Sequence, residues 1–169
     1  MKVEFTNQAN CKFIAELNRN TQIYPHFKLY ELANNKGKTD IPQMILTPEV
    51  DEFFVLVEKF RGMIGRPFNV NSCYRQTDYN KGVGGSRNSL HLRALALDVA
   101  FPSLSYAERL TLYTGWRTIT QAAGKIGGIN FYSWGIHIDS NEKLFGHEQF
   151  VIRNGSNKIV DRVPITLIE

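Results

Sequence analysis

The sequence predicts an α+β fold in which helices flank a small antiparallel sheet. Two segments have the apolar spacing of helices, several short apolar runs are typical of strands, and these elements do not alternate as a regular βαβ repeat. With 169 residues, 43% of them hydrophobic, the chain is long enough for a domain with its own core. It has no internal repeat and no low-complexity linker, so we expect one domain over residues 1–169.

The first helix is expected over residues 48–64. Thr47 can cap it, Pro48 suits the first turn, and Gly65 ends the run. Its apolar side chains recur at helical spacing, which predicts a face buried in the core: Val50, Phe53, Phe54, Val57, Phe60, Met63 and Ile64.

A second helix is expected from Ser105, which forms a capping box with Glu108, to about residue 123. Four short segments are expected to be strands, namely residues 68–71, 94–100, 128–132 and 135–138.

The remaining segments are harder to assign. The polar segment 74–89 is expected to be a loop, and a short helix is expected over residues 10–17. Asn154 and Gly155 separate two apolar runs, which predicts a C-terminal hairpin within residues 145–169.

Composition disfavours several classes of protein. Twenty Lys and Arg against sixteen Asp and Glu give a net charge of +4, which favours approach to an anionic polymer such as a cell wall. The basic residues are scattered, so a nucleic-acid-binding arm is not expected.

No run reaches the ~18 apolar residues of a membrane span. Residues 1–8 lack the apolar core of a secretory signal. Cys11 and Cys73 match no CxxC spacing; we expect free, partly buried thiols, and a disulfide stays open.

His91, Asp98 and His137 are the residues best suited to chemistry. Asp98 interrupts an apolar strand, where a carboxylate must be paired or hold a metal. Two imidazoles and a carboxylate make a three-ligand zinc set with a fourth position for water, whose pKa zinc lowers to ~7; iron is an alternative. Spacing alone slightly favours another interpretation, a hydrogen-bonded histidine beside a buried Asp–Arg pair. In a strand, Asp139 shares a face with His137.

The surrounding motifs resemble those of one family. They are Asn71-Ser72-Cys73-Tyr74-Arg75, Tyr79-Asn80, Gly84-Gly85, Ser89-Leu90-His91, then Ala94, Ala96 and Asp98. These resemble the zinc D-Ala-D-Ala carboxypeptidases and L-alanyl-D-glutamate endopeptidases, peptidoglycan peptidases that share a fold with the signalling domain of hedgehog. The resemblance covers about residues 28–140 and implies the hedgehog/DD-peptidase-like zinc fold.

The resemblance also implies roles for particular residues. His91, Asp98 and His137 would bind one Zn²⁺ ion, and Arg75 would hold the substrate's carboxylate or stabilise the oxyanion, as suits a guanidinium fork. Two further residues are expected to contribute to substrate binding. Ser89 supports the ligand loop or forms a turn, and Trp134 lines the groove or is buried in its turn.

The sequence departs from the family pattern at three positions. Cys73 and Ala94 replace glycines, so the backbone there is expected to be ordinary or strained. Trp134 stands where well-studied members carry an acidic general base. Asp139 is our substitute as the proton carrier. Two alternatives stay open: Asp139 orients a ligand histidine, or it binds the metal itself while His137 acts on protons.

We therefore expect a zinc metallopeptidase, either a D,D-carboxypeptidase or a murein endopeptidase, that cuts amide bonds in peptidoglycan stem peptides or cross-bridges. A phage-type lysis or wall-penetration enzyme is expected, held in the host cytoplasm before release or associated with the virion, and acting at the bacterial cell wall. The alternative is a non-catalytic zinc-binding recognition or assembly module that retains the fold. Neither a nucleic-acid partner nor a membrane span is expected.

Overall fold

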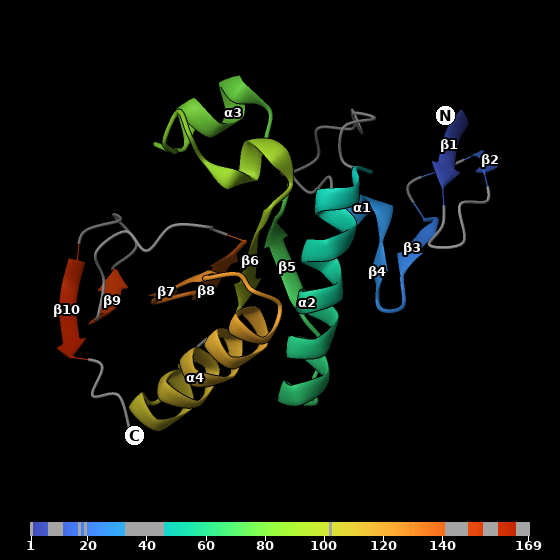
Figure 1. Cartoon of the computed structure of the whole chain (residues 1–169). Helices are drawn as coiled ribbons and strands as arrows, with labels where there is room; N and C mark the ends of the chain where they lie inside the picture. Colours follow the sequence, from blue (N-terminus) through green and yellow to red (C-terminus); the bar gives the residue numbers. More distant parts are fainter. Residues whose placement is uncertain are drawn as a thin grey trace.

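A six-stranded sheet organises the protein (Figure 1). The computed structural model describes residues 2–6, 12–16, 18, 20–32, 46–101, 103–140, 149–153 and 159–164. The strands lie in the order β10-β9-β7-β8-β6-β5, and every neighbouring pair is antiparallel except β7 and β9. Their bounds are Asn69–Ser72 (β5), Ala96–Ala100 (β6), Gly128–Tyr132 (β7), Gly135–Asp139 (β8), Gln149–Arg153 (β9) and Ile159–Pro164 (β10).

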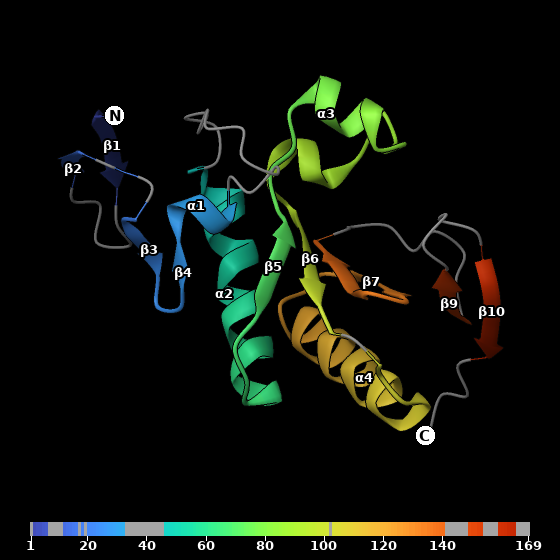
Figure 2. The same cartoon turned by 180° about the vertical axis from the view of Figure 1, so that it is seen from behind.

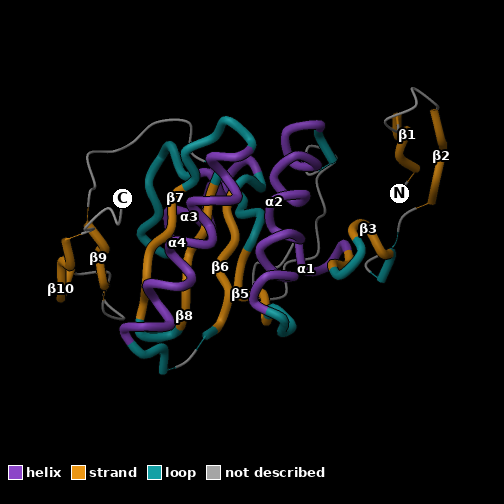
Figure 3. The backbone as a smooth tube through the Cα atoms, turned by 60° about the horizontal axis from the view of Figure 1, so that its bottom comes forward, coloured by secondary structure: helices purple, strands orange, loops and turns teal. Residues whose placement is uncertain are grey.

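Two long helices, α2 (Pro48–Ile64) and α4 (Tyr106–Ala122), cover one face of this sheet, as Figure 3 shows. Trp116 of α4 is fully buried, and its ring meets the rings of Phe53 and Phe60 of α2 edge to face, with centroids 6.2 and 5.2 Å apart. Helices packed on a mainly antiparallel sheet confirm the predicted α+β class.

The ends of both helices follow the predicted capping chemistry. The Thr47 hydroxyl accepts the Val50 N–H at 3.3 Å, and Gly65 ends α2 in the left-handed region at φ 71°. Ser105 and Glu108 form the capping box of α4. Met63 is the exception on the predicted buried face, since it is 46% exposed. It lies in the last turn of α2 against α4, where a Cβ on Gly115 would stand 2.2 Å from its methyl carbon.

The N-terminal region differs from the prediction. The helix expected over residues 10–17 is wrong, because β2 (Lys12–Glu16) pairs there with β1 (Lys2–Thr6). A short apolar run such as 13–15 fits either structure, and the alternating pattern of residues 2–6 supplies a strand partner that decides between them.

A second unpredicted hairpin packs on α2. It consists of β3 (Gln22–Tyr24) and β4 (Phe27–Lys28), and α1 (Leu29–Leu32) follows it; Figure 2 shows all three alongside α2. The Tyr24 ring stacks on Phe54 at 4.4 Å, and its hydroxyl donates to Asp51 at 2.6 Å. These contacts fix the hairpin to the helix.

The segment predicted to be a loop, residues 74–89, contains a helix, α3 (Thr77–Gly82). A 3-10 helix, Leu90–Arg93, follows directly after this segment. At the other end of the chain β9 and β10 pair as an antiparallel hairpin, while its predicted turn at Asn154 and Gly155 lies outside the described residues. No helix in the described part of the chain combines the length and apolar character needed to cross a bilayer.

Candidate metal centre

Strand register brings polar residues together on the sheet face opposite α2 and α4. Asp98 of β6 is paired directly with His137 of β8, and it also pairs with Ser72 of β5 on its other side. The neighbours of Asp98 and His137 along their strands, Leu97, Val99, Ile136 and Ile138, belong to the buried core. Because side chains alternate along a strand, an apolar face toward the helices leaves Asp98 and His137 together on the opposite face.

His91 reaches the same point from the 3-10 helix, which lies just before β6 in the chain. The helix ends at Ala94, whose φ of 56° is left-handed, and the Ala94 N–H donates to the His91 carbonyl at 3.3 Å. Ala94 and Cys73 stand where the family pattern has glycines. Of these two positions, Ala94 has the strained backbone, whereas Cys73 is not among the described residues with positive φ.

Cys73 is a packed, unreactive thiol. It is free and fully buried, with its sulfur 3.9 Å from the Ala94 carbonyl, and burial raises the pKa of the thiol above its usual range. Cys11, the other cysteine, for which a disulfide was left open, lies outside the described residues. The Cys73 carbonyl contributes more directly, since it accepts a hydrogen bond from His91 Nδ1 at 2.6 Å.

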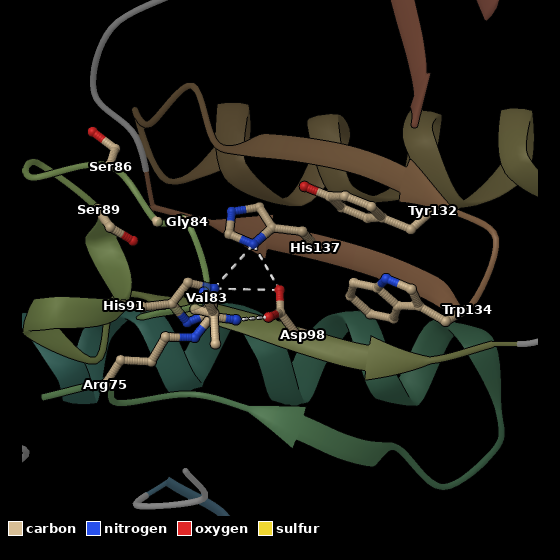
Figure 4. Close-up of a pocket in the computed structure, with 11 residues that line it drawn as sticks. Arg75, Val83, Gly84, Ser86, Ser89, His91, Asp98, Tyr132, Trp134 and His137 are labelled. Carbon is tan, nitrogen blue, oxygen red and sulfur yellow. Dashed lines mark hydrogen bonds and ion pairs between the residues drawn. The ribbon is translucent and has the colours of Figure 1, made fainter. Parts of the chain in front are cut away.

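Three side-chain atoms form a close triangle at the centre of Figure 4. His137 Nδ1 lies 2.8 Å from Asp98 Oδ1 and 3.2 Å from His91 Nε2, and the latter two atoms are 3.3 Å apart. Tetrahedral zinc with ligands at about 2.0–2.2 Å separates neighbouring ligand atoms by about 3.3–3.6 Å. Shifts of about half an ångström or less would turn this triangle into one face of such a site.

The hydrogen bonds on the outer side of each imidazole fix which nitrogen faces the triangle. A carbonyl oxygen can only accept, so His91 Nδ1 donates to Cys73 and the neutral ring leaves Nε2 bare. Likewise, His137 Nε2 donates to the Asp139 carboxylate at 3.2 Å, which leaves Nδ1 bare. With Asp98 Oδ1, three hydrogen-free acceptor atoms converge, and such a set requires a proton or a metal ion between its members.

The pKa values of the three side chains follow from these contacts. Burial disfavours charge on Asp98, but the hydrogen bond from His137 and the close contact with His91 outweigh it and hold the pKa of Asp98 well below its usual range. Burial lowers the pKa of His91. Burial also acts to lower the pKa of His137, yet hydrogen bonds to Asp139 and Asp98 raise it to about 9. In the metal-free protein a proton on His137 therefore balances the carboxylate.

Arg75 completes the floor of the site. One terminal nitrogen of its guanidinium donates to Asp98 Oδ2, its Nε donates to the Ser72 hydroxyl at 2.8 Å, and its backbone N–H donates to the His91 carbonyl at 2.9 Å. The buried Asp–Arg pair considered from the spacing is thus present, but it occurs together with the triangle. Arg75 takes one oxygen of Asp98 and leaves the other directed at the histidines.

Asp139 lies behind His137, on the side away from the triangle. Its Oδ2 accepts from His137 Nε2, and its Oδ1 accepts the Gly128 N–H at 2.8 Å. A Cβ on Gly128 would stand 2.6 Å from both carboxylate oxygens, so glycine there makes room for this side chain. Asp139 is not among the described residues that line the pocket in front of the triangle.

That pocket has a volume of about 290 Å³ and is lined by His91, Asp98 and His137, of which His91 and Asp98 are buried. The three other pocket residues expected from the sequence, Arg75, Ser89 and Trp134, all line it (Figure 4). Gly84 and Gly85, from the matched motifs, line it too, together with three residues that the sequence did not indicate: Val83, Ser86 and Tyr132. Trp134 stacks on Tyr132 with ring centroids 4.7 Å apart and planes 16° apart. The other described histidine, His26, is bonded to Glu58 on the surface.

The residues that the sequence reasoning missed act mainly through contacts with the expected ones. Ser72 holds the Arg75 guanidinium, and Gly128 makes room for Asp139. Tyr132 could have been found from the sequence, because a two-residue turn between the expected strands pairs it with Gly135 and places it diagonal to His137.

Two histidines, a carboxylate and an open pocket are typical of a catalytic rather than a structural metal site. The comparisons name the class more closely: a model of the family described as peptidase M15 matches residues 25–139. That is more than half of the chain, so the chain belongs to the peptidase M15 family. Members of this family are zinc metallopeptidases, which confirms the resemblance drawn from the sequence motifs. No curated protein and no solved structure matches the chain.

Proposed function

We propose that this chain is a zinc-dependent peptidase that hydrolyses amide bonds in the stem peptides or cross-bridges of peptidoglycan. The observation that carries the proposal is the convergence of His91 Nε2, Asp98 Oδ1 and His137 Nδ1 in an open pocket. A structural zinc site uses four protein ligands, whereas a catalytic site keeps one position for water or substrate.

In this proposal His91 Nε2, Asp98 Oδ1 and His137 Nδ1 hold one zinc ion. When bound, zinc supplies an activated water at neutral pH and polarises the carbonyl of the scissile amide. The protein's contribution is orientation, because each ligand is fixed from behind: His91 by the Cys73 carbonyl, Asp98 by Arg75, and His137 by Asp139.

Arg75 is proposed to bind the substrate. Ser72 and Asp98 take two of its five N–H groups, so the remaining N–H groups can meet a substrate carboxylate or the negative charge that develops on the carbonyl oxygen. The contact with Ser72 also holds the guanidinium in place. Ser89 and Trp134 line the same pocket and are proposed to contact the peptide.

The contacts of Asp139 support an orienting role instead of the expected proton transfer. Both of its oxygens are engaged, one with the ring nitrogen of His137 that faces away from the triangle and one with the Gly128 N–H. A carboxylate in this position fixes the tautomer of a ligand histidine. The alternative in which Asp139 binds the metal itself finds no support in these contacts.

The phage-type lysis or wall-penetration role belongs to the same proposal and rests on the motif resemblance. A net charge of +4 supports action on an anionic cell wall.

A non-catalytic zinc-binding recognition module is the second candidate. It is favoured by Trp134 at the position where an acidic group was expected, and by the fact that Asp98 is the sole carboxylate among the described residues lining the pocket.

Digestion of purified murein followed by mass spectrometry of the released fragments tests the proposal. We expect new peptide termini with zinc, none after chelation, and recovery when zinc is restored. His91→Ala should abolish cleavage with the fold intact, whereas His26→Ala, a matched change at a surface histidine, should leave it unchanged. Bound zinc without cleavage of any wall bond would favour the recognition module, and full activity of His91→Ala would overturn the mechanism.

A further inference from the structure

Amide hydrolysis needs a hydrogen-bond donor near the carbonyl of the scissile bond. Negative charge develops on the carbonyl oxygen, and a fixed donor aimed at that oxygen contributes strongly to the rate. Among the described residues that line the pocket, two N–H groups of Arg75 are already committed to Ser72 and Asp98. Trp134 occupies the position at which the resemblance led us to expect an acidic group.

Tyr132 lies beside the triangle and presents a hydroxyl. Strand β7 pairs Asn130 with His137 and Tyr132 with Gly135, so Tyr132 shares the pocket face of the sheet and is diagonal to His137. In Figure 4 its hydroxyl end points toward the His137 ring. It therefore faces the space in which a substrate carbonyl would approach.

Trp134 keeps the Tyr132 ring in this position. The two rings stack with centroids 4.7 Å apart and planes 16° apart. Gly135, the direct partner of Tyr132 across the ladder, carries no side chain that could displace the ring.

From this arrangement, and resting on the proposed function, we propose that the Tyr132 hydroxyl donates a hydrogen bond to the substrate's carbonyl oxygen as negative charge develops on it. A phenol has a pKa near 10, so it is protonated and able to donate at neutral pH. Trp134 is then a positioning residue that holds the phenol ring. Arg75 remains available to bind a carboxylate of the peptide.

The test compares Tyr132→Phe, which removes only the hydroxyl, with Tyr30→Phe, a matched change at a tyrosine on α1 that is 40% exposed. We expect Tyr132→Phe to lower kcat by about 10²–10³-fold, the loss typical of removing one oxyanion donor, with KM and zinc content unchanged. Tyr30→Phe should match the wild type.

A second readout does not depend on turnover. A dipeptide phosphinate that copies the bond cut in the murein digest presents a tetrahedral centre with a charged oxygen. Calorimetric titration should show that Tyr132→Phe binds it more weakly by a factor similar to the loss in kcat/KM. Trp134→Ala should lower kcat in the wild type and add little in the Tyr132→Phe background, as expected for a residue that acts through the tyrosine.

Unchanged kcat in Tyr132→Phe, an effect confined to KM, or unchanged phosphinate affinity would overturn the assignment while the peptidase function stands. Loss of zinc from Tyr132→Phe would also overturn it, because the tyrosine would then support the metal centre. If the wild-type protein with zinc cuts no murein bond, the proposed function fails, and the assignment of Tyr132 fails with it.

Discussion

Replacement of Asp139 by asparagine separates its two proposed roles. The Gly128 N–H can only donate, so it must keep the oxygen of the new amide, and the amide NH₂ then faces His137 Nε2. That NH₂ donates to Nε2 and drives the ring hydrogen to Nδ1, the nitrogen that faces Asp98 and His91. The variant therefore stabilises the tautomer that cannot bind a metal.

The magnitude follows from the geometry. Loss of a group that orients a metal-binding histidine weakens metal affinity by about 10–100-fold, or about 1.4–2.8 kcal/mol. The contact between Asp139 and His137 is 3.2 Å, at the long end for a charge-assisted hydrogen bond, so we expect the lower part of that range. A general base would instead contribute about 10²–10⁴-fold to the rate.

Zinc titration monitored by calorimetry, together with murein cleavage at saturating zinc, distinguishes these cases. We expect Asp139→Asn to bind zinc about tenfold more weakly and to recover most of its activity when zinc is in excess. Asp78→Asn, which removes the same charge from the exposed first turn of α3, serves as the control. Unchanged zinc affinity with activity lost at saturating zinc would refute the orienting role and restore Asp139 as the proton carrier.

Three further predictions concern the same site. Arg75→Lys keeps the charge but cannot hold Ser72 and Asp98 together, so kcat/KM measured at saturating zinc should fall at least about tenfold, and wild-type kinetics would contradict the role of the guanidinium group. Gly128→Ala should lower stability to urea by about 1–3 kcal/mol because its Cβ would meet the Asp139 carboxylate, whereas Gly62→Ala, with nothing within 4 Å, should raise it; equal midpoints would contradict this. Since the pKa of His137 is raised to about 9 in the metal-free fold, the stabilisation from its proton should be complete below about pH 6.5 and lost as the pH rises through about 9. Denaturation of the metal-free protein at pH 6–10 measures this, and a flat stability profile between pH 6.5 and 9 would contradict it.

The central fold could be predicted because its elements carry local signals. The caps at Thr47 and Ser105 place both long helices, and the apolar runs before Asp98 and His137 place two central strands. The β1–β2 hairpin could not be predicted in the same way, because the apolar run at residues 13–15 fits a helix equally well until its strand partner is known.

The candidate site was predicted in its residues but not in its geometry. Residue types, spacing and the motif resemblance together indicated His91, Asp98 and His137, yet only tertiary contacts decide which ring nitrogen of each histidine faces inward. The position of Asp139 likewise could not be predicted without the tertiary contacts. Because Asp139 shares a strand face with His137, it could lie either beside the metal or behind the His137 ring. The room left at Gly128 favours the position behind the ring.

A crystal structure of the protein grown with zinc, with anomalous data collected on both sides of the zinc absorption edge, tests the metal centre most directly. We predict a single strong peak about 2.0–2.2 Å from His91 Nε2, Asp98 Oδ1 and His137 Nδ1, with a fourth position open to the pocket. A peak elsewhere, bonding through His137 Nε2, or no zinc among these three side chains would contradict the account.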